Sequence, residues 1–307
     1  MVAWNQGFTN SPIALLGDIG HVQDPDLFRL FRKLLNHYEV VFYLLGNHDP
    51  YQLTMQVAKT KVRKFEQEMA NLNQSRTTGK FVFLDQTRYD LTHNITILGC
   101  TLFSHITDKQ KLKVGSVMVD FKDTKDWTVD DHNEAHHSDV DWLNAEVTKI
   151  TAEQPQREVV IFTHHSPCTD PRASNPKHRG SDVSSGFVTD LSREECWVNP
   201  KVRMWAFGHT HYNCDFVDDA TGKKIVTNQK GYAKFRAQEG FDMETMYLLP
   251  EGKTYRVRRE SETQPTNSGS STSTRIGKFV HSRGLLGRMK ARLCLLRKDT
   301  LELPTAE

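Results

Sequence analysis

The sequence of 307 residues has little cysteine, and its five cysteines form no recognisable pattern. They are odd in number, widely separated and contain no Cys-x-x-Cys pair; they are Cys100, Cys168, Cys196, Cys214 and Cys294. Disulfide frameworks of small secreted proteins and structural zinc sites built on thiolates both need paired cysteine spacings. The cysteine content therefore argues against both classes.

Long apolar runs are also absent from this sequence. No stretch approaches the roughly 18–20 apolar residues that a membrane-spanning helix needs. Residues 1–11 lack the basic region and the apolar stretch of a secretory leader. No repeat of solenoid length occurs. We therefore expect a soluble, cytoplasmic protein.

The charge is unevenly distributed, although the net charge is only +2. Residues 275–307 hold eight Lys/Arg and three Asp/Glu, while the rest of the chain has a small acidic excess. Residues 261–274 read SETQPTNSGSSTST, a low-complexity composition typical of linkers. We predict an irregular lead-in over residues 1–12, one folded domain over 13–260, a disordered Ser/Thr-rich linker over 261–274 and a basic tail over 275–307.

The pattern of the tail allows a short basic helix over residues 275–297. We expect it to be a solubilising extension. Contact with nucleic acid or a membrane surface is the alternative, which the lack of interleaved aromatic residues disfavours.

Four short apolar runs are each followed by polar residues that can bind a metal. The polar groups are Gly17-Asp18, Gly46-Asn47-His48-Asp49, Thr163-His164-His165 and Gly208-His209-Thr210-His211. An amphipathic helix predicted over residues 26–38 separates the first two runs, so a strand–helix–strand unit with parallel strands is expected. Open α/β sheets place their chemistry at the carboxyl ends of such strands. The four groups therefore predict one shared site.

The ligand types in these groups indicate a transition metal. They are carboxylate, amide oxygen and, most often, imidazole, which suit Zn, Mn or Fe better than Ca or Mg. Four strand ends could hold two metals about 3.5–4 Å apart, which would activate water and polarise a phosphoryl oxygen. An imidazole would remain to protonate the leaving group.

Two groups of histidines are open to alternative interpretations. His164 and His165 cannot both be ligands if they alternate across a strand, so we choose His164 and leave His165 beside the ligands or facing the substrate. His132, His136 and His137 belong to a helix predicted from about residue 128 to 152. We expect these three on a solvated face without a catalytic role.

The order GD, GNHD, HH and GHTH resembles the calcineurin-like metallophosphoesterase superfamily, over a stretch from about Ile13 to Leu249. The resemblance implies an α/β fold of four layers, a double β-sheet sandwich flanked by helices, with the motifs on loops at one edge. By this resemblance Asp18 bridges two metals, and Asn47, His164 and His209 bind the second metal. His211 belongs to the first metal, and His48 is the proton donor to the leaving group.

The resemblance also implies an activity. It is hydrolysis of a phosphomonoester or phosphodiester by a metal-activated hydroxide, on a small molecule or a phosphoprotein. The family pattern begins with a strand ending in Asp-x-His, which supplies two ligands of the first metal, and no such motif precedes Asp18. We therefore expect a sheet edge or gap beside the Ile13–Leu16 strand. The alternative function is an impaired or inactive family member with one metal that acts as a binding or regulatory module.

Overall fold

The computed structural model describes residues 11–73, 78–231, 239–242, 245–249 and 292–296. Most of the predicted lead-in, the whole linker and most of the basic tail lie outside the described residues. Within the described part of the chain, no helix is long and apolar enough to cross a membrane.

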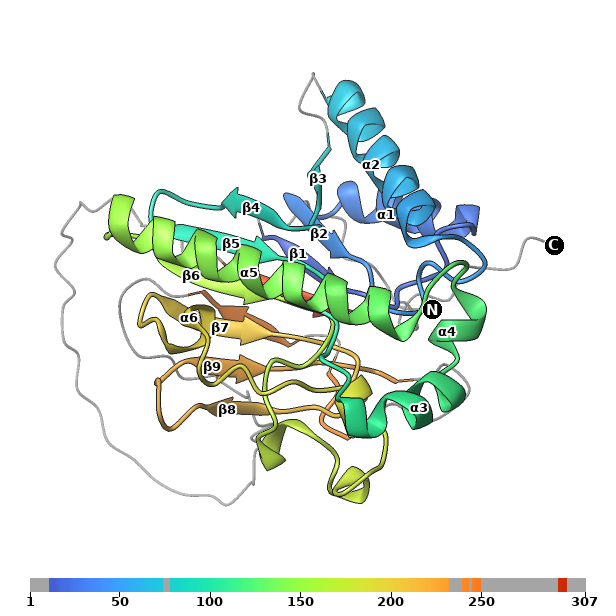
Figure 1. Ribbon diagram of the computed structural model, residues 1–307. Coiled ribbons are helices and arrows are strands. Elements are labelled where there is room, and N and C mark those ends of the chain that lie inside the picture. Colours follow the sequence, from blue (N-terminus) through green and yellow to red (C-terminus); the bar gives the residue numbers. More distant parts are fainter. Residues whose placement is uncertain (1–10, 74–77, 232–238, 243–244, 250–291, 297–307) are drawn as a thin grey trace, which may run out of the picture.

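The strands form two sheets that face each other (Figure 1). The five-stranded sheet has the order β10 (Met246–Leu248), β11 (Arg292–Leu296), β1 (Ile13–Leu16), β2 (Val40–Leu44) and β3 (Lys80–Phe83). The six-stranded sheet has the order β4 (Thr87–Asp90), β5 (Ile95–Gly99), β6 (Glu158–Phe162), β7 (Val202–Ala206), β9 (Lys224–Val226) and β8 (Asp215–Val217). The pair β1–β2 is parallel, as the strand–helix–strand pattern predicts, and β6–β7 is parallel as well.

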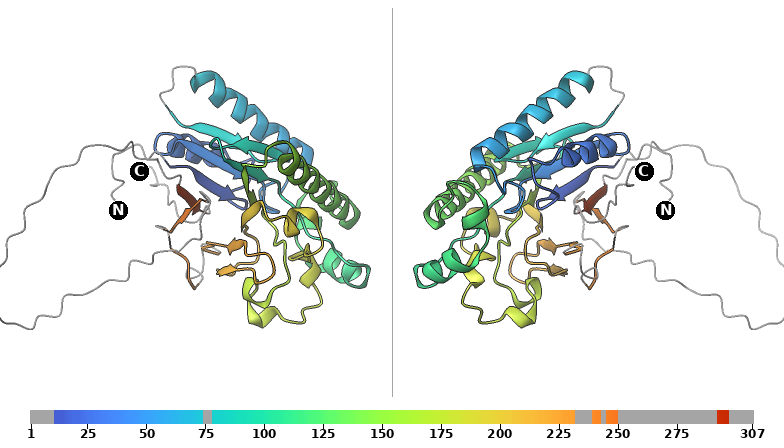
Figure 2. Two further views of the ribbon diagram at one scale, coloured as in Figure 1. Left: turned by 90° about the vertical axis from the view of Figure 1, so that its left-hand side faces the viewer. Right: turned by 90° about the vertical axis from the view of Figure 1, so that its right-hand side faces the viewer.

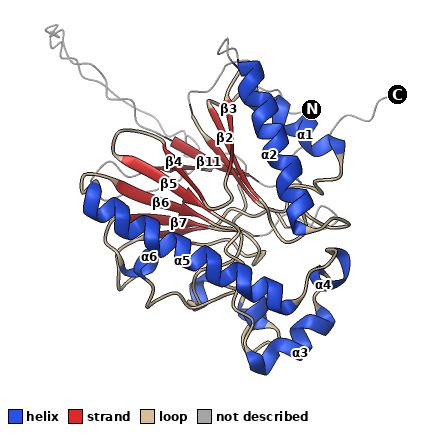
Figure 3. Cartoon of the chain, turned by 45° about the horizontal axis from the view of Figure 1, so that its top comes forward, coloured by secondary structure: helices blue, strands red, loops and turns tan. Residues whose placement is uncertain are grey.

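The main helices cover the outer faces of the two sheets (Figure 3). They are α1 (Pro25–Leu35) and α2 (Met55–Leu72) on the first sheet, and α5 (Val129–Glu153) and α6 (Glu195–Val198) on the second. Two further helices, α3 (Asp108–Val117) and α4 (Asp120–Asp123), precede α5. Figure 2 shows α1 and α2, in blue and cyan, and the green α5 from two further sides.

Alternation along the strands divides the core into three apolar layers. In β1, Ile13 and Leu15 pack against α1 and α2, whereas Ala14 and Leu16 point between the sheets. The third layer lies under α5, where Leu143 is fully buried against the six-stranded sheet. Helix, sheet, sheet and helix follow in that order, which confirms the predicted four-layer α/β sandwich.

The expected gap beside β1 does not occur, and that prediction is wrong. Strand β11 pairs with β1 in parallel, with Ile13 opposite Cys294, and β10 continues the sheet beyond it. Because β1 is hydrogen-bonded on both sides, it is an interior strand. The helix expected over residues 275–297 is likewise wrong at Arg292–Leu296, which forms this strand, and its remaining residues lie outside the described part.

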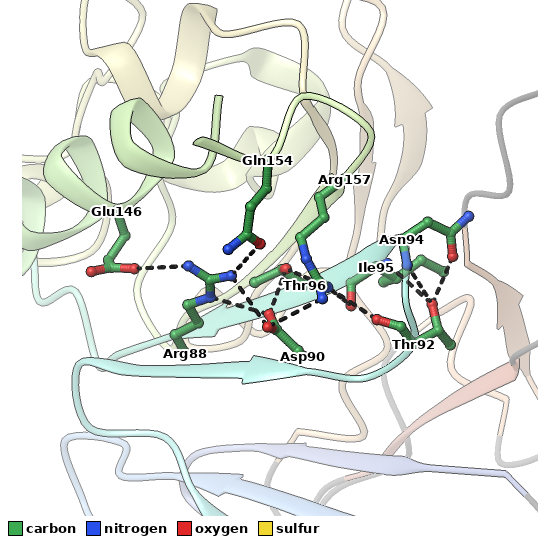
Figure 4. Close-up of polar contacts among 9 residues, drawn as sticks. All are labelled: Arg88, Asp90, Thr92, Asn94, Ile95, Thr96, Glu146, Gln154 and Arg157. Atoms are coloured by element: carbon green, nitrogen blue, oxygen red, sulfur yellow. Dashed lines mark hydrogen bonds and ion pairs between the residues drawn. The ribbon is translucent and has the colours of Figure 1, made fainter. Parts of the chain in front are cut away.

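A polar cluster fastens the end of the six-stranded sheet that lies away from the four motifs (Figure 4). Arg157, just before β6, forms an ion pair with Asp90 and donates to backbone carbonyls in the β4–β5 turn. Arg88 donates to the same carboxylate and to Gln154 at the end of α5. These bonds hold the turn against the start of β6, at the end of the sheet opposite the carboxyl ends of β5, β6 and β7.

Candidate metal centre

Each of the four motifs lies directly beyond the carboxyl end of a strand, two from each sheet. Gly17 follows β1, Gly46 lies just past β2, His164 follows β6 and Gly208 follows β7. The two sheets meet here, since Thr101 Oγ1 donates to the Leu45 carbonyl and His164 Nδ1 lies 2.8 Å from the Leu16 carbonyl. The predicted convergence of the motifs is present in the fold.

Glycine is required at two of these positions because the loops touch. Gly17 has a φ of 83°, and a Cβ there would lie 2.4 Å from His164 Nδ1 and 2.6 Å from the Gly46 backbone. A Cβ on Gly46 would lie 2.2 Å from Asp18 Oδ1. Real Cβ atoms do not come this close to other atoms, so the two glycines allow the strand ends to approach.

Asp49, the last residue of the second motif, links the loop after β1 to the loop after β2. Its fully buried carboxylate accepts hydrogen bonds from the backbone nitrogens of Asp18, Gly20 and Gly46, at 2.8, 3.0 and 2.7 Å. Burial and the nearby charge of Asp18 raise the pKa of this carboxyl to about 6. The sequence offers Asp49 as a possible ligand, but its bonds go to the backbone and make it a structural residue.

The contact between His164 and Asn47 provides a test of whether a metal fits. His164 Nδ1 lies 2.8 Å from the Leu16 carbonyl, which can only accept, so this nitrogen carries the proton. In a neutral ring Nε2 is then an acceptor, and it faces Asn47 Oδ1 at 2.9 Å. In the neutral ring two acceptors at this distance repel each other, and either a proton on Nε2 or a metal ion beside both atoms removes the repulsion. The donor set fits a metal, with His164 oriented by a carbonyl as metal-binding histidines usually are.

Three of the predicted ligands have a strained backbone. Asp18, His209 and His211 have φ values of 54°, 63° and 50°, a left-handed conformation that non-glycine residues rarely adopt. Asp18 Oδ1 accepts from His48 N at 2.9 Å, and Oδ2 lies 3.6 Å from His164 Nε2. Such strain is concentrated at functional sites, where surrounding contacts hold the residue in place.

Three imidazoles lie together at the centre of the site. His164, His165 and His209 each offer a ring nitrogen, and these atoms lie within 4.8 Å of one another. All three side chains are buried, and neither ring nitrogen of His165 has a hydrogen-bond partner among the described residues. Burial, together with the neighbouring imidazoles, lowers the pKa of His165 and His209 well below the usual value. They are therefore neutral, the form that binds metals.

The expectation that His164 and His165 alternate across a strand is wrong. Strand β6 ends at Phe162, and both residues lie beyond it in irregular backbone, so the period of two no longer applies. Their ring centroids are 5.4 Å apart, and His165 stacks on His209 at 4.0 Å.

The remaining predicted residues lie at the margin of the site. His48 is half-buried, and its ring stacks on Tyr51 with centroids 4.9 Å apart. His211 is also half-buried, and its backbone nitrogen donates to Gln229 Oε1. Within the described residues, the compact ligand group comprises the three imidazoles and includes neither Asp18 nor His211. Asp120, which contacts Asn47, was missed because the pattern of residues 109–126 is ambiguous.

The prediction that His132 and His136 are solvated is wrong, whereas His137 is exposed as expected. His132 and His136 have exposed fractions of 1% and 3% and belong to the inner face of α5. His132 Nε2 accepts from Ser104 N, and His136 Nδ1 bonds to the Leu102 carbonyl. Charged and polar residues are interspersed along α5, so the sequence pattern did not reveal which face of the helix is buried.

Acid should destabilise the fold through His132. Burial lowers its pKa to about 3, so below the ordinary value of about 6.5 the unfolded chain binds a proton that the folded chain does not. At pH 4 this amounts to about 3 kcal/mol of lost unfolding free energy, and the loss is absent above pH 7. Chemical denaturation between pH 7 and pH 4 should show that the unfolding free energy of His132→Gln falls less with decreasing pH than that of the unmodified protein. An equal fall in both proteins would contradict the view that buried His132 causes the acid sensitivity.

Known proteins resemble this chain in sequence and in fold. A sequence model of the family described as calcineurin-like phosphoesterase matches residues 4–213. An uncharacterized protein, L509, of Acanthamoeba polyphaga mimivirus is 27% identical over 238 residues, which cover 73% of this chain and 79% of that protein.

A solved structure has a similar fold. The phosphopantetheinyl hydrolase PptH of Mycobacterium tuberculosis superposes with a TM-score of 0.54 at 13% identity, covering 71% of this chain and 78% of that one. At this identity the likeness concerns the fold alone. The family match, which spans more than half of the sequence and contains all four motifs, shows that this chain belongs to the calcineurin-like phosphoesterase family.

Proposed function

We propose that this protein is a metal-dependent phosphoesterase that hydrolyses a phosphomonoester or phosphodiester. The observation that carries the proposal is the pair of acceptors, His164 Nε2 and Asn47 Oδ1, facing each other at 2.9 Å in a buried site. A cation such as Mn, Fe or Zn removes the repulsion between them. Membership of the phosphoesterase family supports the reaction type.

The resemblance to the phosphoesterase family suggests the roles of the residues. Asn47, His164 and His209 would hold one metal, Asp18 would lie between two metals, and His211 would serve the other. When bound, the metals supply an activated water and polarise the phosphoryl oxygens. We add His165 to the predicted ligands, because its ring completes the compact group of three imidazoles.

His48 is proposed as the acid that protonates the leaving group. Its side chain is half-buried, so it can reach a bound substrate from the edge of the site. Its backbone is tied to the Asp18 carboxylate, and its ring is held against Tyr51. A proton donor must be held within reach of the departing oxygen, and these two contacts restrict the movement of His48.

Metal dependence is the direct test of the proposal. The purified protein, supplied with Mn, Fe or Zn, should hydrolyse an aryl phosphate, and removal of metal by a chelator should abolish the activity reversibly. His164→Ala should weaken metal binding by at least about 100-fold, because it removes a buried ligand. The control is His137→Ala, on the exposed face of α5. Absence of activity with each of the three metals would refute the enzymatic function.

A one-metal binding or regulatory module is the second candidate, favoured by the fact that the three imidazoles surround one position. Metal analysis of the purified protein distinguishes the two. Close to two equivalents per chain supports the hydrolase, whereas one equivalent or none, without turnover, supports the module.

A further inference from the structure

A carboxylate outside the four motifs holds two residues of the candidate site. Asp120 is the first residue of α4, and its side chain is buried, with an exposed fraction of 4%. Its Oδ1 accepts hydrogen bonds from Asn47 Nδ2 at 2.8 Å and from the Tyr51 hydroxyl at 2.5 Å. We propose that Asp120 is a positioning residue, which orients the amide of Asn47 and, through Tyr51, the ring of His48. This inference rests on the proposed function.

The bond to Asn47 determines which end of the amide faces the metal position. An amide has a donor end and an acceptor end, and a carboxylate accepts only from the donor end. With Nδ2 committed to Asp120, Oδ1 must face His164 Nε2. Without Asp120 the amide could turn over, and Nδ2 would then donate to His164. That internal hydrogen bond would satisfy both side chains and would compete directly with metal binding.

The bond to Tyr51 extends the effect to His48. The phenol donates to Asp120, which fixes the direction of the Tyr51 side chain. The Tyr51 ring stacks on the His48 ring with an interplanar angle of 25°. A stacked ring limits the rotation of its neighbour, so Asp120 restricts the orientation of the proposed acid through one intermediate side chain.

Backbone hydrogen bonds keep Asp120 in place. Gln52 N donates to the Asp123 carbonyl at 2.7 Å, and Lys125 N donates to the Leu53 carbonyl at 2.9 Å. The helix α4 is thus bonded to the segment that directly follows the Asn47 and His48 motif. Its first residue can therefore act as a rigid support for that motif, as outer residues do around metal ligands.

Three variants test the inference. Asp120→Ala should lower the affinity of the metal-stripped protein for Mn²⁺ by about 10–100-fold, the effect expected from loss of a residue that orients a ligand. Asp120→Asn keeps an oxygen acceptor and should recover part of this loss. Tyr51→Phe leaves the Asn47 contact intact, so Mn²⁺ affinity should stay within about twofold while kcat falls and its pH profile shifts.

The matched control is Asp123→Ala, which removes a carboxylate from the same helix. It should leave Mn²⁺ affinity unchanged, as measured by calorimetric titration alongside thermal unfolding. Unchanged affinity in Asp120→Ala, or an equal loss in Asp120→Ala and Asp123→Ala, would overturn the role of Asp120. If the unmodified protein binds Mn²⁺ but hydrolyses no phosphoester, the proposed function fails, while the affinity comparison still decides the positioning role.

Discussion

Replacement of His48 by alanine is expected to lower kcat for an alkyl phosphate by about 10²–10⁴-fold, the usual contribution of a positioned general acid. Metal content should not change, because the proposed ligands Asn47, His164 and His209 remain. The physical reason is that an alkoxide is a poor leaving group and must receive a proton as the bond to phosphorus breaks. Steady-state kinetics and metal analysis of the same preparation measure both quantities.

The choice of substrate makes this test specific to the proton donor. A phosphate ester with a strongly acidic phenol as the leaving group needs little protonation, so His48→Ala should affect it much less. The control is His93→Ala, in the exposed β4–β5 turn at the other end of the sheet. An equal loss of activity on both kinds of substrate would show that His48 acts in some other way.

Replacement of Gly17 by alanine is expected to cause the largest loss of stability among these variants. The added Cβ would lie 2.4 Å from His164 Nδ1 and 2.6 Å from the Gly46 backbone, in addition to the strain of a φ of 83°. Overpacking of this kind costs about 1–3 kcal/mol, and left-handed strain adds about 1–2 kcal/mol. Denaturant unfolding should therefore show a loss of about 3 kcal/mol, and metal affinity should fall because His164 is displaced.

Gly180 offers a matched control for this substitution. Its φ of 72° is also left-handed, but a Cβ there would meet no atom of the described residues within 4 Å. Gly180→Ala should therefore cost only the strain, about 1–2 kcal/mol, and should leave metal affinity unchanged. The difference between the two variants isolates the close approach of the loops. Equal losses in both proteins would contradict the view that this contact is what requires Gly17.

Several features of the protein could be predicted because they depend on the pattern of neighbouring residues along the chain. The apolar run Ile13–Leu16, followed by glycine and aspartate, predicts a buried strand that presents Asp18 at its carboxyl end, and the structure agrees. The period of apolar residues also locates α1, whose buried residues face the first sheet. Such periodicity depends only on neighbours along the chain, so it is visible without tertiary structure.

Other features depend on residues that are far apart in the sequence. Asp120 and Asn47 are separated by 73 positions, and nothing in the pattern around Asp120 indicates that it is buried. The same holds for the insertion of β11 beside β1 and for the burial of His132 on α5. These placements result from packing between elements, which a local period cannot encode.

The sequence alone determined the four strand-end motifs and the resemblance to the family, which in turn implied the four-layer fold, because motif order and apolar periodicity are properties of the chain itself. Only the tertiary structure decided which atoms face one another. It placed His165 beside His209 because the backbone leaves the strand after Phe162, and it showed that Asp49 binds backbone nitrogens. The orientation of the Asn47 amide is likewise tertiary, since it is fixed by a carboxylate that reaches it from a distant helix.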